Sequence, residues 1–128
     1  MIYVDTSVAL AQLLAEDRCP PLGFWSQDLV TSRLLEYEVW TTIHRRGLES
    51  SHTEDAHQLI QELAFAELSR EVLRRATERF PVPVRTLDAL HLATLLFLRD
   101  QGLDLHLAVY DRRMIDAAEA LEIPLARC

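Results

Sequence analysis

Four acidic side chains, far apart in the chain, stand at positions from which they could share one site. Asp5 follows the short apolar run IYV, and Asp111 follows the run LHLAVY. Asp88 falls in the first turn of the helix predicted for TLDALHLATLLFLRDQG, and Glu38 lies about two turns into the helix predicted after LVTS. In a parallel sheet, strands end and the following helices begin along one edge, where ligands bind. We therefore expect the four carboxylates to face one crevice.

The chemistry expected of such a crevice is that of a hard metal ion. Packed carboxylates repel one another and raise each other's pKa unless a cation compensates them. Cys19 and Cys128 are far apart and belong to no ligand motif, so neither zinc nor a disulfide is expected. Oxygen ligands alone favour Mg²⁺ or Mn²⁺. Water bound to such an ion can attack a phosphodiester, which makes phosphodiester hydrolysis the expected class of reaction.

Each acid, taken alone, also has a purely structural explanation. Asp5 or Asp111 is as well suited to cap a helix as to bind a metal. Asp88 could serve only the dipole of its helix. Glu36 competes with Glu38, because both lie near apolar neighbours and helical periodicity does not choose between them. The interpretation depends on the four positions jointly.

The elements that must position these acids alternate between strands and helices. Strands are predicted at residues 2–4, 29–32, 65–68, 105–110 and 123–126, and helices at 6–17, 33–46, 53–64, 69–80, 86–102 and 111–122. Thr6 or Ser7 is expected to cap the first helix, Thr31 or Ser32 to cap the second, and Gly47 to end the second. The helix over 86–102 is apolar nearly all round and should be buried on most sides. This alternation predicts an α/β fold, a three-layer sandwich with a central, mostly parallel sheet flanked by helices, in a single domain over residues 1–128.

The charge balance limits the kinds of partner. The chain has 20 acids and 13 bases, all of them arginine, for a net charge of -7. This argues against a protein that coats nucleic acid through its general field, although local arginine pairs are compatible with phosphate contacts. No apolar run reaches the roughly 18 residues of a membrane span, and no secretory signal pattern is seen. We expect a cytoplasmic protein without a membrane partner.

Four stretches in the sequence resemble a known family. YVDTSVAL, TSRLLEYEVWT, RTLDALHLATLL and AVYDRRMIDAAEALEI occur in this order and span nearly the whole chain. Together they resemble a PIN domain, specifically the VapC type of toxin ribonuclease from prokaryotic toxin-antitoxin pairs. LDALHLATLL after an arginine is the most specific stretch, whereas DTS behind a short strand is weak by itself.

The resemblance implies an assignment of the acids and a function. It favours Glu38 over Glu36, because the family's glutamate stands six residues after the serine that opens its helix, as Glu38 does after Ser32. It implies a PIN-like fold, RNA as substrate, Mg²⁺ or Mn²⁺ as cofactor, a homodimer and a cognate antitoxin that blocks the site. The catalytic, metal-binding acids that it implies are Asp5, Glu38, Asp88 and Asp111.

Several neighbouring residues receive supporting or structural roles. Thr6, beside Asp5, is expected to orient a metal ligand or a water. Arg112 and Arg113 are the arginines best placed to hold RNA phosphates at the mouth of the crevice. His91 shares a helix face with Asp88, and we interpret it as a core histidine rather than a general base. Asp116 is interpreted as a solvated helical acid rather than a further ligand.

The leading hypothesis is a metal-dependent endoribonuclease, the toxin of a type II toxin-antitoxin system. A phosphoacceptor of the receiver type would use a lysine, and the chain has none. A phosphatase with a nucleophilic Asp5 would need a second aspartate at position 7, which is serine. The alternative that stays open is a catalytically weak or inactive PIN-like module that binds RNA or a protein partner. Val109 supports it, because relatives commonly carry Thr or Ser at that position.

Overall fold

The computed structural model describes residues 1–128 and consists of a four-stranded sheet surrounded by helices. In chain order the elements are β1 (Ile2–Val4), α1 (Thr6–Leu13), the 3-10 helix η1 (Phe24–Ser26), β2 (Leu29–Ser32), α2 (Arg33–Arg45), α3 (Glu49–Gln61), β3 (Ala64–Ala66), α4 (Arg70–Ala76), α5 (Thr86–Asp100), β4 (His106–Ala108) and α6 (Arg112–Ala120). The strand order is β3-β2-β1-β4, and all three neighbouring pairs are parallel. The predicted three-layer α/β sandwich is therefore confirmed.

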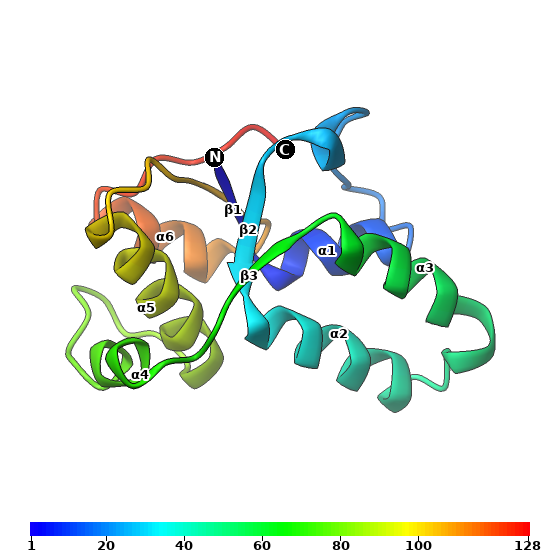
Figure 1. Ribbon diagram of the computed structural model, residues 1–128, viewed down its shortest axis with the longest axis horizontal. Helices are drawn as coiled ribbons and strands as arrows, with labels where there is room; N and C mark the ends of the chain where they lie inside the picture. Colours follow the sequence, from blue (N-terminus) through cyan, green and yellow to red (C-terminus); the bar gives the residue numbers. More distant parts are fainter.

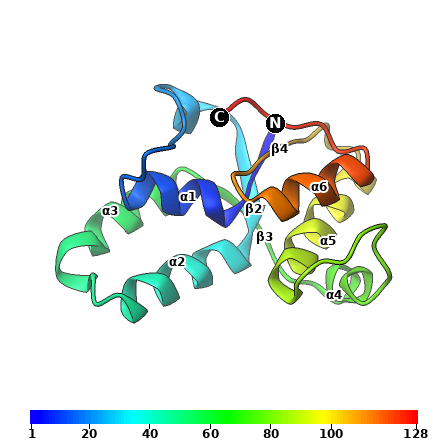
Figure 2. The ribbon, with the colours of Figure 1, turned by 180° about the vertical axis from the view of Figure 1, so that it is seen from behind.

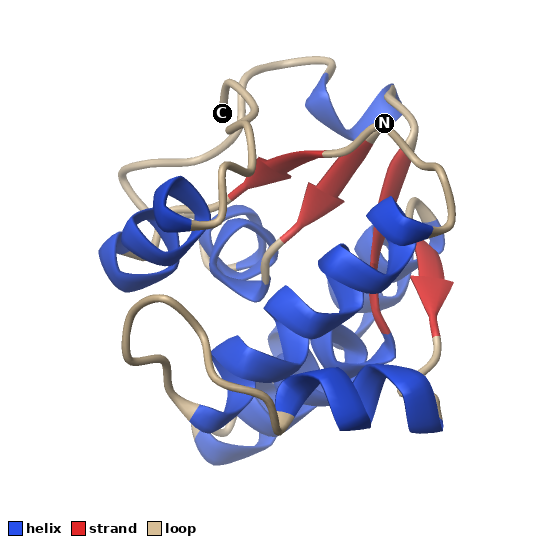
Figure 3. Cartoon of the chain, turned by 90° about the vertical axis from the view of Figure 1, so that its left-hand side faces the viewer, coloured by secondary structure: helices blue, strands red, loops and turns tan.

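Helices cover both faces of the sheet. α1, α2 and α3 lie on one side of the strands and α4, α5 and α6 on the other (Figure 1), so that the strands are enclosed between helices (Figure 3). Successive strand residues face opposite sides, as the pleat requires. Val4 and Ala108 belong to the core with α1, α2 and α3, whereas Tyr3 and Leu107 belong to the core with α5 and α6. Three or four residues per strand thus serve two hydrophobic cores.

Two predictions about the C-terminal half are wrong in detail. Residues 123–126 do not form a closing strand, and only Leu125 makes an isolated bridge to Leu107 in β4. Pro124 lies in this segment and has no N–H with which to extend a ladder. α5 is not buried on most sides, because full burial is confined to His91–Leu95 and Leu87 is 41% exposed.

No helix of the chain is both long enough and apolar enough to cross a membrane.

The strand ends position the starts of the helices. β1 runs into α1, β2 into α2, and β4 into α6 through a loop of three residues, 109–111. The first turns of α1 and α6 lie close together (Figure 2), and the Tyr110 amide donates to Ser7 Oγ at 3.0 Å. Ser32 caps α2 by accepting from the Leu34 amide, and Gly47 ends the turn after α2 with φ 64, both as predicted.

Candidate active site

Asp5 lies at the end of β1 and is held by the backbone amide and the hydroxyl of Ser7. Its side chain is 5% exposed, and its Oδ2 accepts from the Ser7 amide at 3.0 Å and from Ser7 Oγ at 2.6 Å. Asp5 is therefore the N-cap of α1, and the prediction of Thr6 or Ser7 in that position is wrong. The carboxylate begins the helix one residue earlier because it reaches the amide two residues ahead. Ser7 Oγ also accepts from the Tyr110 amide, so one hydroxyl connects Asp5 to the loop that carries Asp111.

Asp111 and Asp88 lie near Asp5, as their electrostatics indicate. Asp111 caps α6, where its Oδ1 accepts from the Arg113 amide at 2.9 Å. Asp88 lies in the first turn of α5. Burial raises the pKa of Asp88 above its ordinary value of 3.8, and the charges of Asp111 and Asp5 raise it further. Asp88 on α5 therefore lies within electrostatic reach of the two carboxylates that follow β1 and precede α6.

Glu38 is held by a buried polar network on the same edge. Its Oε1 accepts from Thr6 Oγ1 at 2.7 Å and from His91 Nε2 at 2.7 Å. His91 Nε2 also lies 3.0 Å from Thr6 Oγ1, and His91 Nδ1 lies 2.9 Å from the Tyr3 hydroxyl. The histidine is 2% exposed and the tyrosine is fully buried. The four side chains Tyr3, His91, Glu38 and Thr6 form a network, which we call the histidine network, that joins β1, α5, α2 and α1.

Burial and nearby acids change the pKa of His91 in opposite directions. Burial lowers the pKa of His91, but the hydrogen bond to Glu38 and the charges of Asp5, Glu38 and Asp88 outweigh burial and raise it. Burial also raises the pKa of Tyr3 far above its ordinary value, so Tyr3 is a neutral phenol. His91 thus supplies hydrogen-bond donors, and when protonated a positive charge, to a site that otherwise contains acids.

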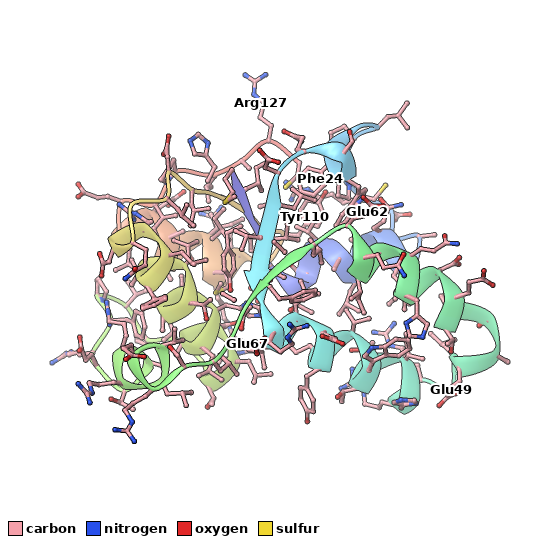
Figure 4. The ribbon with its side chains drawn as sticks, in the orientation of Figure 1. Phe24, Glu49, Glu62, Glu67, Tyr110 and Arg127 are labelled. Atoms are coloured by element: carbon pink, nitrogen blue, oxygen red, sulfur yellow. The ribbon has the colours of Figure 1, made fainter.

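Glu36 has a different environment from Glu38. Its Oε2 accepts from Arg33 at 2.8 Å on the surface, and Arg33 also pairs with Glu67 at 2.8 Å. Figure 4 shows Glu67, which follows β3, beside the first turn of α2. Glu36 therefore belongs to a surface ion-pair group, whereas Glu38 points toward the buried histidine.

The donor set suits a hard cation, although the side chains are not gathered around one point. No group of three or more His, Cys, Asp or Glu side chains has the arrangement of a metal site. Asp5, Asp111 and Glu38 instead accept hydrogen bonds from Ser7, the Arg113 amide and His91. The raised pKa of Asp88 nevertheless indicates a local demand for positive charge, and carboxylate oxygens are the ligands that Mg²⁺ and Mn²⁺ prefer.

The two expected phosphate-binding arginines have different environments. Arg112 Nη2 pairs with Asp116 Oδ1 at 3.0 Å on the surface of α6. The side chain of Asp116 is 52% exposed, so it lies in solvent on its helix. Arg113, in contrast, lines a pocket of about 260 Å³ together with Arg85 and Asp88.

Comparison with known proteins settles the family. The PIN domain model matches residues 2–120. The chain belongs to the PIN domain family. Among curated PIN relatives from Mycobacterium tuberculosis, "Ribonuclease VapC47" is 33% identical over 100 residues, which is 73% of each chain. "Ribonuclease VapC35" is 30% identical over 129 residues, covering 96% of this chain and 93% of the relative.

Solved structures support the PIN fold. A toxin-antitoxin complex from Klebsiella pneumoniae matches with a TM-score of 0.63 at 15% identity, covering 94% of each chain. Mycobacterium tuberculosis VapC20, described as a Sarcin-Ricin loop cleaving toxin, matches with a TM-score of 0.59 at 18% identity over the full length of both chains. At these identities the likeness concerns the fold.

In this PIN domain, two hydroxyls and a histidine do work that the sequence did not reveal. The Thr6 hydroxyl, predicted to orient a metal ligand or a water, donates to Glu38, one of the four acids. Ser7 connects Asp5 to Tyr110, a role that the sequence does not predict. Val109, in place of the usual hydroxyl residue, is 5% exposed and packs in the core with α5 and α6. The hydroxyls of the DTS stretch were the available sequence signal for these contacts. Their partners Glu38 and Tyr110 lie about 30 and 100 residues further along the chain, so local pattern does not identify them.

Proposed function

We propose that this PIN domain is a metal-dependent endoribonuclease and the toxin of a type II toxin-antitoxin pair. The observation that carries the proposal is the placement of Asp88 close to Asp5 and Asp111 at the edge where parallel strands end, where burial and then the charges of Asp111 and Asp5 raise the pKa of Asp88. The curated relatives named VapC ribonucleases support the same activity. We also propose that the substrate is RNA and that the protein is cytoplasmic.

We assign the metal ligands to the four acids of this edge. Asp5, Glu38, Asp88 and Asp111 would hold Mg²⁺ or Mn²⁺. When bound, the ion would supply an activated water for phosphodiester hydrolysis and charge stabilisation for the phosphate. The chain's own contribution is orientation, because Ser7 fixes Asp5 while Thr6 and His91 fix one oxygen of Glu38.

Protein partners follow from the same family membership. One structural neighbour is a toxin-antitoxin complex, which supports a cognate antitoxin as partner of this chain. We propose that the antitoxin blocks the edge of the sheet that carries these four acids, which we call the acidic edge. We also propose that the chain forms a homodimer. Arg113 is the arginine that we place at the mouth of the site, because Arg112 is already paired with Asp116.

The test is cleavage of a mixed-sequence RNA by the purified protein in Mg²⁺ or Mn²⁺. Cleavage should stop on addition of EDTA and leave 5′-phosphate ends, because water rather than a ribose hydroxyl is the nucleophile. Asp88→Asn should abolish cleavage, while Asp116→Asn, which removes an exposed acid, should retain it. Full activity after chelation would contradict the metal mechanism.

A second candidate function is an inactive PIN module that binds RNA or a protein. The burial of Val109 in the core favours it, because no hydroxyl is available at this position to orient a ligand. Isothermal titration with Mn²⁺ separates the two. Absence of binding, or equal binding after Asp5→Asn, would favour the inactive module.

A further inference from the structure

A groove between α4 and α5 opens beside the acidic edge. It has a volume of about 610 Å³ and is lined by α4, by the first turns of α5 and by the connection between them. Apolar side chains contribute half of its lining, among them Leu73, Phe80 and Val82. Its volume is in the range of small-ligand pockets, about 300–1,000 Å³.

The groove is continuous with the pocket at the acidic edge. Pro83, Val84 and Arg85 line both, and the smaller pocket adds Asp88 and Arg113. A chain that ran from the groove into the smaller pocket would therefore reach Asp88.

Two exposed arginines line the place where the groove meets the pocket at the acidic edge. Arg85 and Arg113 are exposed, and neither forms an ion pair within the chain. The one acid lining the groove, Glu78, lies 3.7 Å from Arg75, which also stacks over Phe80 at 4.7 Å. The groove thus presents guanidinium groups that form no ion pair beside an apolar floor, and a positively charged groove that follows the phosphate backbone is one part of single-strand binding.

We propose that the groove between α4 and α5 binds the RNA segment on one side of the cleaved phosphate, with Arg85 and Arg113 holding phosphates where the groove meets the acidic edge. The inference rests on the proposed ribonuclease function. It adds Arg85 to the RNA-binding residues and assigns the strand a path along one side of the protein. The apolar floor receives a base, and the two arginines offset the acidic field that the phosphates meet at Asp5, Asp88 and Asp111.

The test measures binding rather than cleavage. Fluorescence anisotropy follows a fluorescein-labelled single-stranded RNA of about 20 nucleotides, longer than the roughly 4–16 nucleotides that such grooves cover. Ca²⁺ replaces Mg²⁺ to slow hydrolysis, and a gel checks the RNA after each titration. The affinity is recorded across a range of KCl concentrations for wild type and variants.

Arg85→Gln and Arg113→Gln should each weaken binding about three- to tenfold and lower the salt slope by about 0.7, the value for one lost contact to a single strand. Arg127→Gln and Arg99→Gln are matched controls, since they remove the same charge from places that line neither the groove nor the pocket with Asp88, and both should bind as wild type does. Equal weakening by all four variants, or unchanged binding in the first two, would overturn the inference while leaving the ribonuclease proposal intact.

The groove itself is tested with exposed leucines. Leu73→Glu places a carboxylate in the wall of the groove and should weaken RNA binding, whereas Leu103→Glu, beyond the end of α5, should not. Unchanged RNA binding by Leu73→Glu would assign the groove to another occupant, such as a protein, and overturn the inference. A wild-type protein that neither binds RNA in Ca²⁺ nor cleaves it in Mg²⁺ would overturn both proposals.

Discussion

Replacing Tyr3 with phenylalanine should destabilise the protein through one hydroxyl group. The Tyr3 hydroxyl lies 2.9 Å from His91 Nδ1, with the tyrosine 0% and the histidine 2% exposed. Tyr3→Phe keeps the ring and its packing but leaves Nδ1 without a partner where water has no access. The cost of an unsatisfied buried group is about 1–3 kcal/mol, so the free energy of unfolding should fall by that amount.

Urea denaturation in EDTA measures this change without a contribution from metal binding. Tyr37→Phe is the matched control, because Tyr37 is 64% exposed and its loss of a hydroxyl should change stability by less than about 0.5 kcal/mol. A double-mutant cycle with His91→Leu identifies the partner, since the cost of Tyr3→Phe should largely disappear once the histidine is gone. A Tyr3→Phe protein as stable as the Tyr37→Phe control, or an additive cycle, would refute the role assigned to this hydrogen bond.

Two further predictions concern the acids. Ser7→Ala should weaken Mn²⁺ binding about 10- to 100-fold in calorimetric titration, because Asp5 loses the hydroxyl that orients it, whereas Ser26→Ala, on the exposed 3-10 helix, should bind as wild type does. Asp88→Asn should raise the melting temperature of the metal-free protein at pH 7, because it removes a half-buried carboxyl group whose ionisation is disfavoured by burial and by the charges of Asp111 and Asp5, and Asp116→Asn should not. Since the pKa of Asp88 is raised in the folded state, its ionisation costs stability as pH rises through that pKa, so the stabilisation by Asp88→Asn should vanish as pH falls below 3.8.

The sequence predicted the backbone of the site well because simple periodicities determine it. The short apolar runs before Asp5 and Asp111 form parallel strands. Helical periodicity does not choose between Glu36 and Glu38, and it is the family resemblance that favours Glu38, whose Oε1 contacts His91. The rule that parallel strands end along one edge is then enough to bring the acids near one another. The single-domain prediction over residues 1–128 stays a prediction.

The side-chain partners could not be predicted, because they depend on long-range packing. His91 and Glu38 are 53 residues apart, and Ser7 and Tyr110 are 103 residues apart. Helical spacing placed His91 on one face with Asp88, but only the crossing of α5 and α2 brings its ring to Glu38. The missing closing strand has a local cause, since a proline interrupts a segment that hydrophobic pattern alone describes as a strand.

The histidine network also affects how the two halves of the molecule communicate. Elsewhere the sheet separates the two hydrophobic cores. At this edge, however, a continuous chain of polar contacts crosses from α1 and α2 to α5. A ligand that draws Glu38 out of that chain would leave His91 Nε2 and Thr6 Oγ1 with only each other as partners across the sheet. Occupancy of the acidic edge should therefore alter amide exchange in α1 and α5 together, so that neither flank responds alone.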